Sequence, residues 1–291
     1  MIVKIYLNGK LVEKQDAKVS VFDHGFLYGD GAFEGIRSYN GLVFRLEGHI
    51  KRLYETMHTL MIDPRMTKKE MSEAVVATLR ANKLKDAYIR LIVSRGDGDL
   101  GLDPRKCFGK PNVIIITDKI TLYPAELYTR GMEIITVATI KNHPNALNPQ
   151  LKSLNYLNNI LAKIEAVHCG YNEAIMMDPN GYVGECTGDN VFIIKNGVLS
   201  TPHLGRLKGI TADAILGIAE KMKIKTMEGF ITRHEVYNAD ECFLTGTAAE
   251  LIPVVKVDGR LIGNGKPGAI TNKLLKAFKG LTKKDGTKYA V

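Results

Sequence analysis

The stretch Asn148-Pro149-Gln150-Leu151-Lys152-Ser153-Leu154-Asn155-Tyr156-Leu157 leads into a segment with helical periodicity. Large apolar residues recur there at every third or fourth position, which predicts a helix with one buried stripe. The members of this stripe are Leu154, Leu157, Leu161 and Ile164. Gly170 is well placed to end the helix, because glycine is favoured just past a helix C-terminus.

Lys152 stands directly before the stripe, among polar residues and after a proline. If the helix extends back this far, Lys152 and Tyr156 lie four positions apart and share a face away from the stripe. A lysine held beside a tyrosine in this way is suited to act as a Schiff-base amine. From these residues alone, a solvated lysine at a helix start is the simpler interpretation.

The length of 291 residues is comfortable for two domains. The hydrophobic content of 45% is ordinary for a globular protein, and no apolar run reaches a membrane-spanning length. The first ten residues are broken by charges and a turn signal, so we expect no signal peptide.

The cysteines lie far apart and contain no C-x-x-C pair; they are Cys107, Cys169, Cys186 and Cys242. This spacing predicts reduced thiols in a cytoplasm and argues against a zinc site, so we expect no bound metal. The formal net charge of +9 permits an anionic ligand or a nucleic acid. However, six lysines gather in residues 273–288, where we expect a solvated surface, and basic and aromatic residues do not interleave. A nucleic-acid-binding module is therefore the weaker interpretation.

Strand and helix signals alternate along the chain, with many hairpin turns. The predicted strands are 2–8, 11–13, 87–95, 111–117 (buried), 132–140, 191–195 and 241–245. The predicted helices are 47–61, one capped at Thr67-Lys68-Lys69-Glu70, the helix after Lys152, and those starting at Thr211 and Ala269. The hairpin signals are Asn8-Gly9, Asn40-Gly41, 178–181, Asn196-Gly197 and Asp258-Gly259. This mixture, dominated by antiparallel hairpins, predicts the α+β class.

The strand at 87–95 alternates, so Tyr88 and Arg90 point to one side while Ile89 and Leu91 point to the other. The sequence that follows, Gly96-Asp97-Gly98-Asp99-Leu100-Gly101, matches the G-x-G-x-x-G dinucleotide pattern. No amphipathic helix follows it, and its two aspartates would repel a pyrophosphate. We therefore reject a dinucleotide site there.

Two motifs together decide the family resemblance. Lys152-Ser-Leu-Asn-Tyr-Leu-Asn-Asn159, followed by Glu185-Cys-Thr-Gly-Asp-Asn-Val-Phe192, resembles the pyridoxal-phosphate (PLP) aminotransferases of fold type IV. Phe-Glu-Gly-Ile-Arg at 33–37, Ala-Tyr-Ile-Arg at 87–90 and Gly-Thr-Ala-Ala-Glu at 246–250 favour the branched-chain amino-acid aminotransferases within that group. The resemblance runs from Val21 to about Asp258.

The resemblance implies a set of cofactor residues. Lys152 matches the lysine that holds PLP and shuttles the proton, and Glu185 matches the acid at the pyridine nitrogen. An edge-strand surface residue is the alternative for Glu185. Gly209-Ile210-Thr211 opens a helix and offers N–H groups and a hydroxyl to the phosphate. The remaining residues assigned to PLP are Arg52, Tyr156, Ile210, Thr211 and Thr247. Periodicity alone would make Arg52 a solvated residue.

The resemblance also implies substrate residues. Tyr88, Thr247 and Ala248 match those that hold the α-carboxylate, and Arg90 matches the arginine for the second carboxylate of glutamate. Phe33 and Gly35 match an apolar wall. Tyr28 matches a tyrosine that reaches in from a neighbouring subunit, which implies a homodimer or a higher homo-oligomer. For Phe33 and Tyr28 an ordinary core position is the alternative.

The expected protein is a transaminase that exchanges amino groups between leucine, isoleucine or valine and 2-oxoglutarate, without nucleic acid or membrane as partner. We expect a small N-terminal α+β domain over 1–118, a linker over 119–130, and a larger domain over 131–291 that carries the PLP lysine. A fold-type-IV transaminase for D-amino acids or amines, or an aminodeoxychorismate lyase, is the alternative. Ala212, the short 201–207 loop and Leu91 depart from the family pattern, which leaves substrate range and cofactor affinity open.

Overall fold

A computed structural model describes residues 3–119 and 123–290. Its contacts divide the chain into two compact units. The first contains the described residues of 1–120 and 282–291 together with Leu151–Asn155, and the second contains those of 121–150 and 156–281. The lysine stretch and the C-terminal segment thus join the first unit, although both lie beyond residue 120 in sequence.

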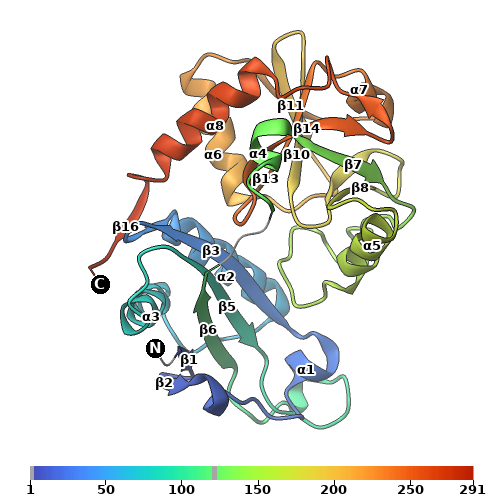
Figure 1. Cartoon of the computed structure of the whole chain (residues 1–291). Coiled ribbons are helices and arrows are strands. Elements are labelled where there is room, and N and C mark those ends of the chain that lie inside the picture. Colours follow the sequence, from blue (N-terminus) through green and yellow to red (C-terminus); the bar gives the residue numbers. More distant parts are fainter. Residues whose placement is uncertain (1–2, 120–122, 291) are drawn as a thin grey trace. The chain divides into compact units, whose positions relative to one another are not determined.

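The first unit is an antiparallel sheet in the order β16-β4-β3-β5-β6-β1-β2 (Figure 1). Its strands are β1 (Lys4–Leu7), β2 (Lys10–Glu13), β3 (Gly31–Tyr39), β4 (Leu42–Phe44), β5 (Ala87–Ser94), β6 (Asn112–Asp118) and β16 (Gly286–Lys288). Its helices are α1 (His24–Tyr28), α2 (Leu46–Leu60) and α3 (Lys68–Ala81), with 3-10 turns at Lys14–Asp16 and Pro104–Lys106. The predicted hairpins at Asn8-Gly9 and Asn40-Gly41 are confirmed.

Helices α2 and α3 pack on one face of this sheet. Their side chains Leu53 and Val75 share a buried cluster with Ile36 of β3 and Ile89 and Leu91 of β5. The capping box predicted at Thr67 is present, since Thr67 Oγ1 accepts from Glu70 N and the Glu70 carboxylate accepts from Thr67 N. Because strand residues alternate, Phe33, Gly35, Tyr88 and Arg90 point to the opposite face of the sheet.

The second unit is built on a sheet in the order β12-β11-β10-β13-β14-β7-β8-β9, with β15 paired to β14. Its strands are β7 (Met132–Thr136), β8 (Ala174–Met177), β9 (Val183–Cys186), β10 (Asn190–Lys195), β11 (Val198–Pro202), β12 (Thr226–Gly229), β13 (Glu241–Gly246), β14 (Glu250–Val257) and β15 (Arg260–Leu261). Its helices are α4 (Leu127–Arg130), α5 (Leu157–His168), α6 (Ile210–Lys221), α7 (Arg233–Tyr237) and α8 (Ala269–Leu281).

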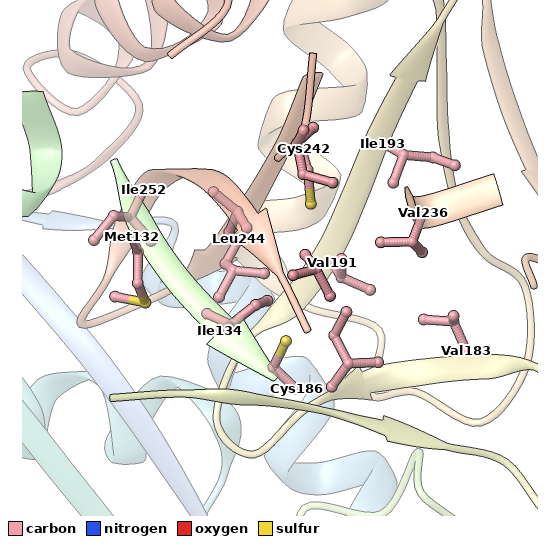
Figure 2. Close-up of a cluster of buried hydrophobic side chains, with 14 of the residues drawn as sticks. Met132, Ile134, Val183, Cys186, Val191, Ile193, Val236, Cys242, Leu244 and Ile252 are labelled. Atoms are coloured by element: carbon pink, nitrogen blue, oxygen red, sulfur yellow. The ribbon is translucent and has the colours of Figure 1, made fainter. Parts of the chain in front are cut away.

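One buried cluster of this unit joins strands that are distant in sequence. Figure 2 shows Met132 and Ile134 of β7 gathered with Cys186 of β9, Val191 of β10 and Leu244 of β13. Phe192 and Phe243 stack with their ring centroids 5.0 Å apart, and they alternate with residues of that cluster along β10 and β13. Both faces of these two strands are therefore buried, which explains their nearly continuous apolar sequences.

The helix after the lysine stretch differs from the prediction in two ways. α5 begins at Leu157, so Lys152 and Tyr156 do not share a helical face. The predicted burial of the stripe is also wrong, because Leu157, Leu161 and Ile164 are 66%, 47% and 57% exposed. Helix α5 instead packs against β8 through the alanines Ala162 and Ala166, whose small size permits close approach. Gly170 follows the helix with φ +84°, as predicted.

Smaller predictions have mixed outcomes. The strand predicted over 132–140 ends at Thr136, and β6 alternates between buried and exposed residues instead of being buried throughout. A short helix, α4, lies within the predicted linker 119–130, of which 120–122 fall outside the described residues. The six lysines of 273–288 are exposed, as expected. In the described part of the chain, no helix combines the length and apolarity needed to cross a membrane.

Candidate active site

Backbone pairing with β3 places Lys152 in the first unit. Phe33 N donates to Lys152 O (2.9 Å), and Leu154 N donates to Gly31 O (2.9 Å). The segment around Lys152 therefore runs as an extra antiparallel neighbour of the start of β3, next to the predicted apolar wall. Lys152 is half-buried, so the alternative of a solvated lysine at a helix start does not describe it.

The ring of Phe33 is the centre of a cluster on the face of β3 and β5 opposite to α2 and α3. Lys152 Nζ lies 4.5 Å from the ring centroid, and the Arg90 guanidinium carbon lies 4.6 Å from the same centroid. Both cations contact an aromatic face, an interaction worth about 0.5–2 kcal/mol depending on desolvation. Phe33 is 7% exposed, so this buried ring lies against two cations.

Tyr88 and Arg90 contact one another across this face, as their shared strand side predicts. Arg90 Nη2 donates to Tyr88 Oη at 3.2 Å. Position 35 has room only for glycine, because a Cβ there would lie 2.1 Å from Tyr88 Oη. The sequence-predicted residues Lys152, Phe33, Gly35, Tyr88 and Arg90 are thus brought together within one unit.

Arg52 lies on α2, on the helix-covered side of the sheet, and pairs with the buried Glu34 of β3. Arg52 Nε is 2.7 Å from Glu34 Oε1, and Nη2 is 2.8 Å from Oε2. His49 Nδ1 is 2.8 Å from Oε2 of the same carboxylate. The Arg52 side chain is only 11% exposed, so the expectation of a solvated arginine from periodicity is wrong. Sequence reasoning missed Glu34, the partner that orients this guanidinium.

The charge of Arg52 and the contact between Glu34 and His49 determine which of these side chains are ionised. Burial alone would raise the pKa of Glu34, but the Arg52 charge and the His49 hydrogen bond lower it to about 2. Burial lowers the pKa of His49; the bond to Glu34 opposes this shift, and the charges of Arg52 and Lys152 add to it. At neutral pH we therefore assign an ionised Glu34 and a neutral His49 that donates from Nδ1.

In the second unit, Glu185 is buried near the end of β9. The ammonium of Lys141 lies 2.8 Å from its Oε1, while Asn190 Nδ2 (3.1 Å) and Leu207 N (2.9 Å) donate to Oε2. β9 is an edge strand, yet the carboxylate is held by three donors and is not a surface group. Sequence reasoning missed Lys141, which stands alone outside every motif.

Asn190 joins Glu185 to the start of α6. Its Nδ2 also donates to Leu207 O at 2.9 Å, and a Cβ at Gly209 would lie 2.1 Å from its Oδ1. Gly209 is the N-cap of α6 and supplies no side-chain cap, so the first N–H groups of the helix include those of Ile210 and Thr211. The structure thus brings Glu185 and the predicted phosphate-binding segment together.

Thr247 and Ala248 lie in the turn between β13 and β14, directly after Gly246. Thr245 precedes this turn and pairs with Asn190 across the strands, so both side chains share a face. Among the described residues, the Thr245 hydroxyl is a buried polar atom without a hydrogen-bond partner. Tyr156, the N-cap of α5, is half-buried, and the Tyr28 hydroxyl donates to Leu100 O.

Each unit contains residues that suit one part of PLP. A carboxylate offers about four acceptor positions, and three at Glu185 are used by protein donors, which suits one further donor such as a pyridinium N–H. An uncapped helix start and an orphaned hydroxyl on the neighbouring face suit an anion such as the phosphate. A half-buried lysine amine beside an aromatic ring suits covalent attachment.

The sequence profile described as Amino-transferase class IV matches residues 31–257. The chain belongs to this family. A Methanocaldococcus jannaschii protein, provisionally named a branched-chain-amino-acid aminotransferase, is 54% identical over 288 residues, which cover 98% of this chain and 99% of that protein.

Two solved structures of branched-chain amino acid aminotransferases have the same fold as this chain. The Escherichia coli branched-chain amino acid aminotransferase has a TM-score of 0.94 at 36% identity, covering 99% of this chain and 97% of that one. The branched-chain amino acid aminotransferase from Thermobaculum terrenum in its PLP form has a TM-score of 0.87 at 29% identity, covering 97% and 94%. The fold-type-IV prediction, the α+β class and the dependence on PLP are confirmed.

Proposed function

We propose that the chain is a PLP-dependent transaminase acting between leucine, isoleucine or valine and 2-oxoglutarate, with branched-chain 2-oxo acids and L-glutamate as products. One observation carries the proposal: Lys152 and Arg90 contact the same Phe33 ring, beside Tyr88. This arrangement places an amine, an anion-binding guanidinium and an aromatic surface together. The class IV family match supports the reaction type.

The residues of the chain divide the chemical tasks. Bound PLP supplies the electron sink that makes an α-proton acidic. Lys152 Nζ would hold the cofactor and, once released from it, would accept the α-proton of the bound substrate. The Glu185 carboxylate stabilises positive charge at the ring nitrogen. The N–H groups and hydroxyl at the start of α6, with Arg52 and Thr247, bind the phosphate.

Recognition of two unlike substrates is assigned to the β5 face. Tyr88, with Thr247 and Ala248, binds the α-carboxylate that every substrate shares. Arg90 binds the distal carboxylate of glutamate, and Phe33 and Gly35 contact aliphatic side chains. An arginine fork binds a carboxylate through two parallel hydrogen bonds, so Arg90 suits an acidic substrate that leucine does not resemble.

We further propose that the chain works as a homodimer or higher homo-oligomer, as the assignment of Tyr28 to a neighbouring subunit's site requires. The exposed apolar face of α5 (Leu157, Ile160, Ile164) in the second unit supports this. In the first unit, the side chains of Phe26, Leu102 and Phe108 are exposed as well. An exposed apolar helix face such as that of α5 marks an interaction surface. A cytoplasmic location stays a prediction, supported by four unpaired cysteines.

The test is a pair of half-reactions followed by absorbance of the bound cofactor. Leucine and glutamate should each convert the purified PLP form to the pyridoxamine form, and 2-oxoglutarate should reverse it. D-alanine and a simple primary amine are the comparison substrates. If either is a better donor than leucine, the branched-chain assignment is wrong, although the assignment of Lys152 would stand.

A further inference from the structure

A second polar cluster lies in the second unit, behind the turn that joins β9 to β10. Tyr123 Oη is 3.3 Å from Glu173 Oε2 and 3.2 Å from Asp189 Oδ2. The three residues are 5%, 1% and 4% exposed. None of them has a role in the proposed reaction.

The two contacts of the Tyr123 hydroxyl favour a protonated carboxyl group beside it. A phenol has one hydrogen, so it can donate to one of the two carboxylates; the other contact is a hydrogen bond only if that carboxyl donates to the phenol oxygen. Two adjacent buried carboxylates also repel each other, which favours one shared proton over two charges.

The surroundings identify the carboxyl group that holds the proton. Glu173 Oε1 accepts from the backbone N–H groups of Ala174 (2.8 Å) and Thr187 (2.9 Å) and from the Thr187 hydroxyl. Glu173 Oε2 lies 3.6 Å from Lys163 Nζ. These donors stabilise the ionised form of Glu173. The proton therefore belongs on Asp189.

The titratable groups around Asp189 agree with this assignment. Burial, first, and then the charge of Glu173 raise the pKa of Asp189 to about 7; Glu185 adds to the increase, while the Tyr123 bond and Lys163 oppose it. Burial also raises the pKa values of Tyr123 and Cys186, so both stay uncharged.

Asp189 lies between two segments of the proposed site. Cys186 N donates to Asp189 O at 2.8 Å, which closes the turn from Glu185 to Asn190. Asn190 points toward Glu185 and binds it, while Asp189 alternates to the other side. There its Oδ1 lies against Gly246, where an added Cβ would be only 1.9 Å away. One carboxyl group thus contacts the segment that opens the Thr247–Ala248 turn.

We propose that Asp189 is a positioning residue that holds the Glu185–Asn190 turn and Gly246 in place through a neutral carboxyl group shared with Tyr123 and Glu173. Its consequence for catalysis rests on the proposed function of Glu185 and of the Gly246–Ala248 segment. When Asp189 loses its proton, two neighbouring carboxylates carry charge in the interior, and the two segments lose their common support.

The pH dependence follows from the raised pKa. The folded state holds the Asp189 proton more tightly than the unfolded state does, so the contribution of Asp189 to stability is complete below its unfolded pKa. It is lost as pH rises through the folded pKa near 7. Asn is the same shape and cannot ionise, so Asp189→Asn should remove this loss.

The first experiment needs no variant and no activity. Infrared spectra of the wild-type holoenzyme should contain a protonated carboxylic acid C=O band at about pH 5.5 that disappears by about pH 8.5. Absence of the band at the lower pH would overturn the proposal. Since this readout does not depend on transamination, it separates this inference from the proposed function.

The second experiment compares thermal unfolding of wild type and Asp189→Asn holoenzyme at the same two pH values. The melting temperature of wild type should fall, relative to that of the variant, as pH rises. Asp178→Asn is the matched control, because Asp178 is buried at the other end of β9 and accepts from the N–H groups of Asn180 and Tyr182. Parallel pH curves for wild type and Asp189→Asn would contradict the proposal.

The third experiment tests positioning. In wild type, kcat of the leucine half-reaction should decrease as pH rises above neutrality. In Asp189→Asn, this alkaline decrease in kcat should begin at a pH that is higher by about one unit or more. KM should change less than kcat, because the carboxyl group does not touch substrate. If kcat decreases at the same pH in wild type and Asp189→Asn while the infrared band is present in wild type, Asp189 holds a proton but has no positioning role, and the proposal is wrong.

Discussion

The ammonium of Lys141 lies 2.8 Å from Oε1 of Glu185, and both side chains are almost completely buried. A buried ion pair is costly to break, because removing one partner leaves the other charge desolvated and uncompensated. The acid proposed to contact the pyridine nitrogen is thus paired with a buried ammonium from a residue outside the family motifs. The effect of Lys141 on protein stability can therefore be measured by replacing it.

We predict that Lys141→Met destabilises the cofactor-free protein by about 3–5 kcal/mol, since Glu185 then carries an unpaired buried charge. The double variant Lys141→Met/Glu185→Gln should regain much of this loss, because the substituted glutamine side chain is neutral. Urea unfolding of wild type, both single variants and the double variant measures the coupling. Additive losses would mean that the two side chains do not depend on each other.

Replacement of Glu185 alone tests its chemistry. Glu185→Gln keeps the shape of the side chain but removes the charge opposite the ring nitrogen. We expect the variant to bind the cofactor and to slow both half-reactions on the order of 100-fold or more. Single-turnover absorbance measurements give both rates. Wild-type rates in this variant would show that Glu185 does not face the ring nitrogen.

The ionisation of Glu34 predicts how the stability of the protein changes at acidic pH. The pKa of Glu34 is lowered to about 2 in the folded state, so its contribution to stability is present above its unfolded pKa and is lost as pH falls toward 2. A shift of this size corresponds to about 3 kcal/mol. Glu34→Gln should therefore be less stable than wild type at neutral pH, and the gap should narrow as pH decreases below about 4.5. Urea midpoints across this range measure it; a constant gap would contradict the assignment.

Arg90 should affect one substrate class and not the other. Arg90→Lys keeps a positive charge but loses the two-pronged geometry that a carboxylate matches. We predict a penalty of about 1.5–3 kcal/mol for glutamate and 2-oxoglutarate, with the leucine half-reaction nearly unchanged. Stopped-flow measurement of each half-reaction separates the two. Equal losses would mean that Arg90 binds the shared α-carboxylate.

Local signals in the sequence predicted local structure well. The alternation of 87–95 placed Tyr88 and Arg90 on one face, and their hydrogen bond confirms it. The capping box at Thr67 and the turns at Asn40-Gly41 and Asn196-Gly197 were predicted from residues that are neighbours in sequence. Such features depend on short-range backbone chemistry, which a single sequence contains.

Long-range contacts could not be predicted in this way. Lys141 and Glu185 are 44 positions apart, and no local sequence pattern in either segment predicts that they form an ion pair. The Glu34–Arg52 pair likewise depends on how α2 packs on β3. The periodicity of α5 correctly indicated an amphipathic helix but not what covers its apolar face, because alanines form its contact with β8. Family resemblance, not periodicity, supplied Arg52 and the role of Lys152.

The central claim is that Lys152 Nζ holds PLP, and borohydride reduction of the purified holoenzyme followed by peptide mapping tests it most directly. The account predicts a yellow protein in which reduction fixes the cofactor on the peptide that contains Lys152. It also predicts that Lys152→Ala loses both the label and transaminase activity. Lys163→Ala is the control, because this lysine lies on α5 beside Glu173 and should leave the label in place. A label on any lysine other than Lys152 would contradict the account.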